Sequence, residues 1–501
     1  MRRKIRKLLA ATLIVGTLTF APEICGVENF PVARADVKLY TAMGVDYGNE
    51  YESQDIVKLR ARDKAIKNAT KQAGVYLKTY SRSINNELTD DEILAITSNA
   101  YEVVGEVRYN RTVKQVTDQI TLIVWEATVD VNVDDGEITK WVKRDDRDRS
   151  TLISQTRESQ TAAEENDRKV EDLRRRSQNV SDDAGRAQLQ TEFNQADNEF
   201  LSNQKVEEAN RASYRGDLEE TAKLYSEAIE LNPKNALAYL SRATLYSANV
   251  SVIKHNLQDS PRFKRVKSHG DDAATYYKLA LADFDKAIEL TPNDARIYAR
   301  RGYAHYNFGK YPQALADYDN ALRIDPACLE AYMNRNMYYR FVLKDDKLAL
   351  ADLNRAIELN PDKAGGYSLR SLLYKNSKQY SLALADINKV IQLEPGKATS
   401  YYFRGDLYLK LGDYNRAVED FNRARELDPD LYVVNFGLAK AHEKLGRYDL
   451  AIEDYTQIIK DSSEKDAAIW YYKRGKCYEA LGDKTKAKAD IAKAKALGFS
   501  L

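Results

Sequence analysis

A proline returns along the C-terminal three-fifths of the sequence at a nearly fixed interval. Pro292, Pro326, Pro361, Pro395 and Pro429 are 34, 35, 34 and 34 residues apart. The prolines at 326 and 361 end two similar segments, Ala-Leu-Arg-Ile-Asp-Pro and Ala-Ile-Glu-Leu-Asn-Pro. A fixed period of this length indicates stacked supersecondary units. Because each unit buries its apolar face only against its neighbours, we expect a repeat array in this region.

The repeat at residues 398–429 shows how such a unit is built. Apolar or small residues at helical spacing form one buried stripe on each of two helices. Gly412 suits the turn between the helices, and Pro429 ends the second helix. The stripe residues are Tyr401, Gly405 and Tyr408 on the first helix and Ala417, Phe421 and Ala424 on the second.

This pattern resembles the tetratricopeptide repeat (TPR) family. The resemblance implies a mostly α protein in which residues 202–501 form a right-handed solenoid of about eight helix-turn-helix repeats. A small α+β domain and a charged helical linker precede the solenoid. The last repeat lacks a closing proline and is rich in lysine, as a solvent-facing cap should be. We place the repeats at 202–233, 236–292, 295–326, 329–361, 364–395, 398–429, 432–463 and 468–497.

The second repeat is interrupted. Pro233 and Pro292 are 59 residues apart, and the extra residues lie near 249–274. The sequence leaves two interpretations open, a basic docking loop or a solvated extension of two helices, and we favour the second. The basic residues of the insertion are Lys254, Arg262, Lys264, Arg265 and Lys267.

An arginine and an aspartate also recur. Six repeats have Arg where the TPR family usually has Leu, and Asp precedes the large residue of the second helix in seven. Because the arginine fork suits a carboxylate, we predict a structural Arg–Asp bridge inside each repeat that has both residues. The seventh repeat pairs Leu438 with Asp454 and has no bridge. The predicted pairs are Arg242/Asp283, Arg301/Asp317, Arg335/Asp352, Arg370/Asp386, Arg404/Asp420 and Arg474/Asp490.

Residues 36–147 follow a different pattern. We expect a strand over 37–47, a long helix from Ser53 or Gln54 to about 81, and a shorter helix over 90–100. Alternating residues at 101–113 and 120–133 predict paired strands, and a short helix at 138–142 follows. The phrases Ala-Met-Gly-Val, from Ala42, and Ala-Arg-Asp-Lys-Ala, from Ala61, resemble the N-terminal domain of flagellar T-ring assembly proteins and some envelope lipoproteins. The resemblance implies an envelope location and a role in assembly or anchoring.

Residues 148–201 form the charged linker. No sustained heptad is present, so a coiled coil is not supported. We expect solvated helix in two pieces, broken near residues 177–185, that spaces the two domains. The few large apolar residues near and within it are Leu152, Ile153, Val170, Leu173, Leu189 and Phe193.

Residues 1–35 indicate a secretory signal peptide. Five basic residues precede an apolar run at 8–21, and Ala33-Arg34-Ala35 offers a cleavage site. An uncleaved anchor helix is the alternative. We therefore expect an exported protein, periplasmic or associated with the cell envelope or fully secreted, whose mature chain has no transmembrane segment. Cys328 and Cys477 follow no disulfide framework and are read as small core residues.

The sequence gives little support for catalysis, a metal or a cofactor. Its four histidines lack metal-ligand spacing, and no nucleophile elbow or phosphate loop occurs. His305 and His442 occupy a repeat position usually filled by Tyr, so we expect packed core histidines. Lys plus Arg number 77 against 76 for Asp plus Glu, a balance that argues against nucleic-acid binding. We predict a protein that is not an enzyme.

The TPR resemblance implies that the first helices of successive repeats line a concave groove that binds a protein or peptide. The groove would be aromatic and basic, as interface centres often are. Chaperone-binding TPR proteins hold a terminal carboxylate at positions matching Val206, Asn210, Ser241, Arg296 and Arg300 here. Only Asn210 and the two arginines keep that character, so we do not predict this clamp. The predicted groove residues are Arg296, Arg300, Tyr303, Tyr306, Arg340, Phe341, Lys375, Tyr402, Lys410, Phe436, Lys440 and Tyr472.

Three functions are compatible with these observations. The leading hypothesis is an exported scaffold or adaptor that binds its partner in the groove during envelope assembly. The second is a structural component of an envelope or flagellar-type assembly, anchored through the N-terminal domain. A weaker third is recognition of cell-wall glycan by groove tyrosines.

Overall fold

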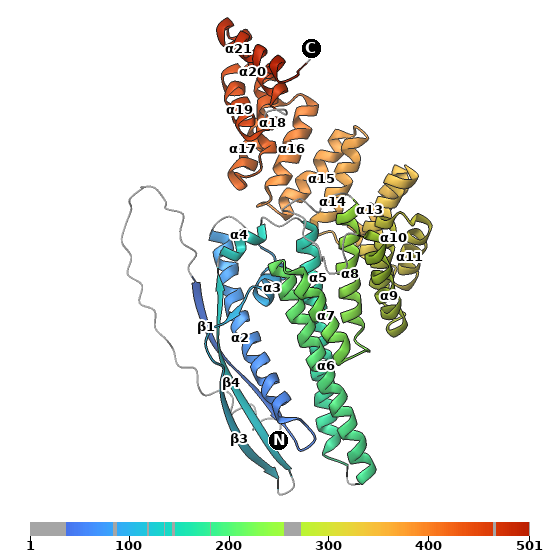
Figure 1. Ribbon diagram of the computed structural model, residues 1–501. Helices are drawn as coiled ribbons and strands as arrows, with labels where there is room; N and C mark the ends of the chain where they lie inside the picture. The colour runs from blue at the N-terminus through green and yellow to red at the C-terminus, as the bar shows by residue number, and fades with distance from the viewer. Residues whose placement is uncertain are drawn as a thin grey trace, which may run out of the picture. The chain divides into compact units, whose positions relative to one another are not determined.

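A computed structural model describes residues 37–83, 88–117, 120–134, 136–142, 146–180, 182–254, 272–463 and 467–499 (Figure 1). The expected signal peptide lies outside the described residues, and so does most of the basic insertion. Within the described ranges, no helix is long and apolar enough to cross a membrane. The expected fold class is confirmed: helix pairs in tandem follow a small domain that contains strands.

The N-terminal domain is a sheet covered by a long helix. Its elements are β1 (Val37–Gly48), α2 (Gln54–Ser83), α3 (Asp90–Asn99), β2 (Glu102–Val103), β3 (Arg108–Thr117), β4 (Ile120–Asp134) and α4 (Gly136–Val142). Strand β4 pairs antiparallel with β1, β2 and β3. A β-carbon at Gly44 of β1 would lie 2.2 Å from the backbone nitrogen of Ala65 in α2. Glycine at this position therefore lets the helix approach the sheet closely.

Two long helices follow, α5 (Asp146–Ser177) and α6 (Asp183–Arg215), and the chain breaks between them where we expected. The expectation that both are solvated was wrong. Val170 and Leu173 of α5 pack against Leu189, Phe193 and Ala196 of α6 in one buried cluster. The apolar residues are few, but their helical spacing places them on facing stripes of the two helices. The pair is a packed hairpin rather than a solvated spacer.

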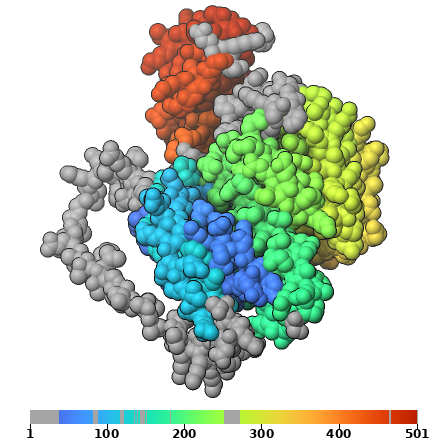
Figure 2. Space-filling view, turned by 60° about the horizontal axis from the view of Figure 1, so that its bottom comes forward, coloured from blue at the N-terminus to red at the C-terminus, as the bar shows by residue number. Residues whose placement is uncertain are grey.

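Charged side chains fasten this hairpin to the N-terminal domain. Arg174 of α5 donates hydrogen bonds to Glu52 and to Asp46 of β1. Arg60 of α2 donates to Glu52 at 3.0 Å and to Asp197 of α6 at 2.9 Å. All five residues are buried, and each charge has an opposite partner. Figure 2 shows the N-terminal strands and helices (blue to cyan) against the green surface of α6.

The repeats begin inside α6, which runs without interruption from the hairpin into the first repeat. Each later repeat is a pair of antiparallel helices, and Figure 1 shows the succession from α8 to α21. The pairs after α7 (Leu218–Leu231) are α8 (Ala236–Lys254) with α9 (Ala273–Leu290), α10 (Ala295–Phe308) with α11 (Tyr311–Ile324), α12 (Leu329–Tyr338) with α13 (Asp346–Leu359), α14 (Ala364–Asn376) with α15 (Tyr380–Leu393), α16 (Ala398–Leu411) with α17 (Tyr414–Leu427), α18 (Val433–Lys444) with α19 (Tyr448–Asp461) and α20 (Ala468–Ala480) with α21 (Lys484–Ala496).

The fourth repeat contains one residue more than its neighbours, and the structure shows where that residue goes. A short π-helix, η1 (Tyr339–Leu343), extends α12, and Lys344 then takes a left-handed conformation with φ of 59°. A π-turn absorbs a single added residue within a helix. The π-helix therefore accommodates the extra residue that makes the proline spacing 35 at this repeat, and the next helix pair follows as in the other repeats.

All six predicted Arg–Asp bridges are present. In each, the arginine Nε and Nη2 donate to the two carboxylate oxygens at 2.6–3.0 Å. The remaining nitrogen, Nη1, donates at 2.6–2.9 Å to a side chain of the preceding repeat. Each arginine thus joins two repeats, a contact that the sequence analysis did not predict. In the seventh repeat His442 lies 2.8 Å from Asp454.

Candidate functional site

The first helices of successive repeats share one surface, which we call the first-helix surface. It is formed by α6 from residue 202 onward and by α8, α10, α12, α14, α16, α18 and α20. Helix α10 contacts both α8 and α12, and α16 contacts α18, so these first helices adjoin one another directly. All twelve predicted groove residues belong to helices of this surface or to η1.

Helix α5 occupies the first three repeats of this surface. The Glu158 carboxylate accepts hydrogen bonds from Arg300 at 2.6 and 3.3 Å, and Arg296 lies 3.3 Å from it. Ser154, one turn earlier on α5, donates to the same carboxylate at 2.8 Å. The side chain of Glu158 is 5% exposed and that of Arg300 is 12% exposed. The Arg300–Glu158 contact is therefore a charge-assisted hydrogen bond that is largely shielded from solvent.

A second set of contacts lies beside this carboxylate. Asn210 of α6 donates to the Ser159 hydroxyl at 2.7 Å and to the Gln155 carbonyl oxygen at 3.4 Å. The Tyr225 hydroxyl of α7 donates to the Asn210 side-chain oxygen at 2.8 Å and so orients the amide. Three of the five positions compared with the chaperone clamp, Asn210, Arg296 and Arg300, thus bind the chain's own helix.

The charges around Glu158 affect its ionisation. Burial alone would raise the pKa of its carboxyl, but the nearby Arg300 and Arg296 bring the pKa below its ordinary value. Burial likewise disfavours the charged form of Arg300, and Glu330 and Glu158 together raise its pKa. Arg300 bonds to Glu330 of α12 as well as to Glu158, so it joins α5, α10 and α12. The site is built to hold an ionised carboxylate.

Glu158 is the site residue that the sequence analysis missed. The buried face of α5 at this level consists of Leu152, Gln155, Thr156, Glu158 and Ser159, which follow helical spacing. Hydrophobic periodicity does not detect such a stripe because most of it is polar. The only signal in the sequence was the spacing of these residues on one helical face.

The predicted groove residues of the third to fifth repeats differ in how exposed they are. The Arg340 guanidinium lies 4.8 Å from the ring centre of Phe341, and the Phe341 side chain is 51% exposed. Lys375 pairs with Asp406 at 2.5 Å and lies over the ring of Phe403. In the third repeat Tyr306 packs near Tyr311, while Tyr303 is partly buried. Arg340 and Phe341 are the members of this group most available to a partner.

The last three repeats use their predicted aromatic residues for packing. Tyr402 lies against Phe421, Phe436 against Trp470, and Tyr472 stacks on Phe499. Lys410 and Lys440 are exposed. The predicted groove residues therefore fall into three groups. Two bind α5, and several pack the repeats against each other. A smaller group is exposed and includes Phe341, Lys410 and Lys440.

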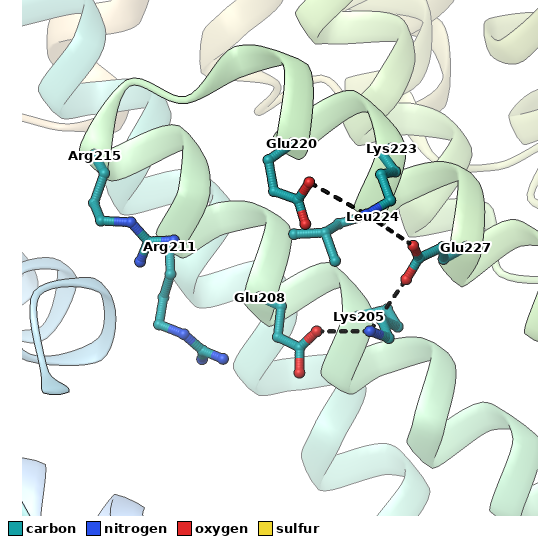
Figure 3. Close-up of a pocket in the computed structure, with 8 residues that line it drawn as sticks. All are labelled: Lys205, Glu208, Arg211, Arg215, Glu220, Lys223, Leu224 and Glu227. Carbon is teal, nitrogen blue, oxygen red and sulfur yellow. Dashed lines mark hydrogen bonds and ion pairs between the residues drawn. The ribbon is translucent and has the colours of Figure 1, made fainter. Parts of the chain in front are cut away.

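A pocket of about 400 Å³ lies elsewhere, between α6 and α7 (Figure 3). Its charges are largely satisfied within it: Lys205 pairs with Glu208 and Glu227, and Lys223 with Glu220 and Glu227. Such a paired surface is not organised for acid–base or nucleophilic chemistry. It is lined by Lys205, Glu208, Arg211, Arg215, Glu220, Lys223, Leu224 and Glu227.

The cysteines and histidines that the structure describes are buried in the repeat packing. Cys328 and Cys477 are buried free thiols, and burial raises their pKa values to about 11 and about 12. His305 and His442 are buried, as expected, and His305 shares a hydrogen bond of 2.7 Å with Tyr277. Among the residues that the structure covers, no group of three His, Cys, Asp or Glu side chains is placed to hold a metal ion.

Comparison with known proteins identifies the repeats. Profiles described as tetratricopeptide repeat match residues 295–328 and 398–431, residues 364–397, and residues 436–498. The chain therefore contains tetratricopeptide repeats within residues 295–498. The N-terminal resemblance to flagellar T-ring proteins remains a prediction.

Solved structures of other proteins match parts of this chain at low overall similarity. PilF of Pseudomonas aeruginosa is 19% identical, with a TM-score of 0.36, over 41% of this chain and 93% of PilF. YrrB, described as a TPR protein with an unusual peptide-binding site, is 25% identical, with a TM-score of 0.29, over 42% of this chain and 96% of YrrB. PilW, described as a type IV pilus biogenesis factor, is 20% identical, with a TM-score of 0.35, over 40% of this chain and 92% of PilW.

Proposed function

We propose that this chain is a non-enzymatic scaffold that binds a protein or peptide partner on the first-helix surface of repeats 4 to 8. After export, it would act in assembly of the cell envelope. The observation that carries the proposal is the contrast along this surface. Repeats 1 to 3 are covered by α5, whereas Phe341, Lys410 and Lys440 are exposed beyond them. Aromatic and cationic side chains of this kind favour a partner with apolar and acidic groups.

The test uses the full chain, because Leu152 of α5 and Tyr214 of α6 belong to the core of the N-terminal domain. Fragments cut near these helices would expose that core. The tagged chain is used to capture proteins from an envelope extract of its source cells, and the captured proteins are identified by mass spectrometry. A variant with Arg340, Phe341, Lys410 and Lys440 all replaced by Ala should lose the specific partner.

The matched control replaces Arg323, Arg355 and Arg425 by Ala. These residues are exposed on the second helices α11, α13 and α17. The control should capture the partner as the unmodified chain does. Equal capture by the first-helix variant and the unmodified chain would contradict the proposed surface. The proposal of export is tested separately, by N-terminal sequencing of the mature protein from fractionated cells.

A second candidate function is anchoring through the N-terminal domain, and one observation favours it. Strand β1 pairs with β4 alone among the described strands, and Leu39, Met43 and nearby Val75 are 58%, 53% and 69% exposed. Apolar side chains along a sheet edge are suited to an intermolecular contact. Replacing Leu39 and Met43 by Thr should then prevent incorporation into the envelope, while partner capture through the repeats is retained.

A further inference from the structure

The two edge strands of the N-terminal sheet differ in how well they are protected. Strand β1 pairs with β4 in one continuous register over its twelve residues, without a bulge, and it contains no proline. Strand β3, at the opposite edge, has a register shift between residues 115 and 117 and carries Arg108, Arg111 and Lys114. Bulges and charged side chains keep edge strands from pairing with other chains. The edge at β1 is therefore the one that is open to pairing.

The free edge of β1 is formed by the backbone groups of alternate residues. The carbonyl oxygen of Met43 accepts a hydrogen bond of 2.9 Å from the Asn68 side-chain amide of α2, so it points away from β4. Because peptide groups alternate along an antiparallel pair, the N–H and C=O of Leu39 and Thr41 point to the same side. The side chains of Leu39 and Met43 are more than half exposed. A strand placed here would gain main-chain hydrogen bonds and apolar contacts together.

Helix α2 adds a wall beside this edge, and Figure 1 shows it running alongside β1. A hollow of about 540 Å³ is lined by Thr41 and Met43 of β1 and by four residues of α2. The four are three or four residues apart, so they share one face of the helix, and all of them are exposed. These helix residues are Asn68, Lys71, Gln72 and Val75.

The side chains on this face of α2 suit one kind of ligand. Asn68 and Gln72 have amide groups, which both donate and accept hydrogen bonds and so can bond to a peptide backbone. Lys67, one turn before Lys71, pairs with Asp63 at 2.7 Å. Lys71 itself forms no ion pair with the described residues, so its ammonium group is available to a carboxylate. The hollow therefore favours an extended segment that carries a carboxylate between apolar residues.

We propose that β1 and this face of α2 bind an extended segment of a partner protein, which adds a strand to the sheet beside β1. Alternate side chains of the added strand lie against Leu39 and Met43 on the outer face of the sheet. The intervening side chains face α2, where a Glu or Asp pairs with Lys71. The partner itself rests on the second candidate function, anchoring through the N-terminal domain, but the strand site can be tested with peptides.

Two other occupants fit this edge less well. A lipid surface would cover the apolar side chains, but its hydrocarbon offers no hydrogen-bond partner to the backbone groups of the edge. A second copy of the chain, paired through a two-fold axis near Thr41, would bring the two Lys71 side chains together, and like charges repel. An acidic strand from another protein satisfies both the backbone groups and the lysine.

The probe is a phage library of random linear nonapeptides. It is selected on the immobilised first-helix variant of the full chain, so that peptides specific for the exposed residues of repeats 4 to 8 are not collected. The selected peptides should place a Glu or Asp between apolar residues at alternate positions. Fluorescein-labelled synthetic forms are then measured on the unmodified full chain by fluorescence anisotropy.

Substitutions in the chain test the backbone edge and the charge separately. Thr41→Pro removes an N–H from the free edge and leaves the bonds to β4 in place, so it should weaken binding at least tenfold. Lys71→Glu should weaken binding of the acidic peptide at least fivefold and should strengthen binding of the same peptide with Lys in place of its acidic residue. The matched control is Lys114→Glu, at an exposed position of β3, which should bind like the unmodified chain.

A change in the peptide tests strand pairing without altering the chain. Two peptides are N-methylated at alternate residues, one on each edge of the extended strand. Only one edge faces β1, so one peptide should lose binding to the unmodified chain at least tenfold and the other should retain it. Equal effects of the two methylation patterns would overturn the proposal.

Other outcomes also contradict the proposal. Selection of no peptide overturns it, and so does equal binding of the acidic peptide to the Lys71→Glu and Lys114→Glu chains. Binding to phosphatidylglycerol vesicles that depends on Leu39 and Met43, with no peptide selected, would assign the edge to a membrane surface. A dimer that Thr41→Pro dissociates would assign it to a second copy. Normal incorporation of the Leu39 and Met43 variant into the envelope contradicts anchoring alone and leaves the peptide results intact.

Discussion

The first-helix surface has two parts, a front formed by repeats 1 to 3 and a rear formed by repeats 4 to 8. Both are built from helix pairs, but they differ in what covers them. Repeats 1 to 3 hold α5 through buried polar contacts centred on Glu158. Repeats 4 to 8 expose Phe341, Lys410 and Lys440. The Arg–Asp bridges continue through both parts, so the difference lies in what covers the surface and not in how the repeats are built. A repeat sequence specifies the scaffold, while residues outside it decide which part is open.

The largest expected effect on stability comes from breaking the contact between α5 and the front of the surface. Arg300→Met would leave Glu158 buried without its main partner, and removing one side of a buried ion pair costs about 3–5 kcal/mol. The free energy of unfolding in urea should fall by this amount. Lys410→Met, at an exposed position of the open part, is the control. A loss of less than about 1 kcal/mol for Arg300→Met would show that the front contact adds little.

The second prediction tests what the two parts share. Arg301→Leu in the front and Arg404→Leu in the rear each remove the partner of a buried aspartate, Asp317 or Asp420. Each change should lower the free energy of unfolding by about 3 kcal/mol. The two losses, measured in urea, should agree within about 1 kcal/mol. A large difference would mean that α5 contributes to the bridges as well as to the surface.

The third prediction concerns the fixed end of the α5–α6 hairpin. Burial and the neighbouring Glu52 raise the pKa of Asp197 to about 6, although Arg60 bonds to it. Since the folded-state pKa is raised, the stabilisation from protonated Asp197 is complete below its unfolded pKa and is lost as pH rises through about 6. Asp197→Asn should reduce the stability difference between pH 4 and pH 7 by about 2 kcal/mol. Urea unfolding at several pH values measures this, and an unchanged profile would contradict it.

The smallest effect on stability is expected in the rear of the surface, where the lysine side chains are exposed. Lys410→Ala and Lys440→Ala should each change the free energy of unfolding by less than about 0.5 kcal/mol, since exposed side chains contribute little. Their effect should appear instead in partner binding. Thermal unfolding of both variants beside the unmodified chain gives the measurement. A loss of several degrees would show that these lysines stabilise the repeats.

Features that repeat or alternate could be predicted from the sequence. The helix pairs follow from proline spacing, and the strands of the N-terminal domain follow from alternation. The Arg–Asp bridges were predicted because a complementary pair recurs at one spacing. In each case many residues carry the same signal, so a single exception does not hide it.

The front contact could not be predicted because it depends on residues that occur once. Gln155, Glu158 and Ser159 are ordinary polar residues of a charged helix until the fold brings Arg300 and Asn210 to them. The packing of Tyr402 on Phe421 was missed for a related reason. A family's ligand position shows which way a residue faces but not which neighbouring side chain covers it.

The arginine contacts between repeats bear on how the array unfolds. Each bridging arginine also bonds to the preceding repeat, but the seventh repeat has Leu438 there, which has no donor to offer the sixth. Nearest-neighbour terms govern the cooperativity of repeat arrays. The junction between α17 and α18 therefore lacks a coupling present at the other bridged junctions. Leu438 instead lies with Phe421 and Ala424 of α17 in one buried apolar cluster, so the coupling between repeats 6 and 7 should be less sensitive to salt than that of the bridged junctions.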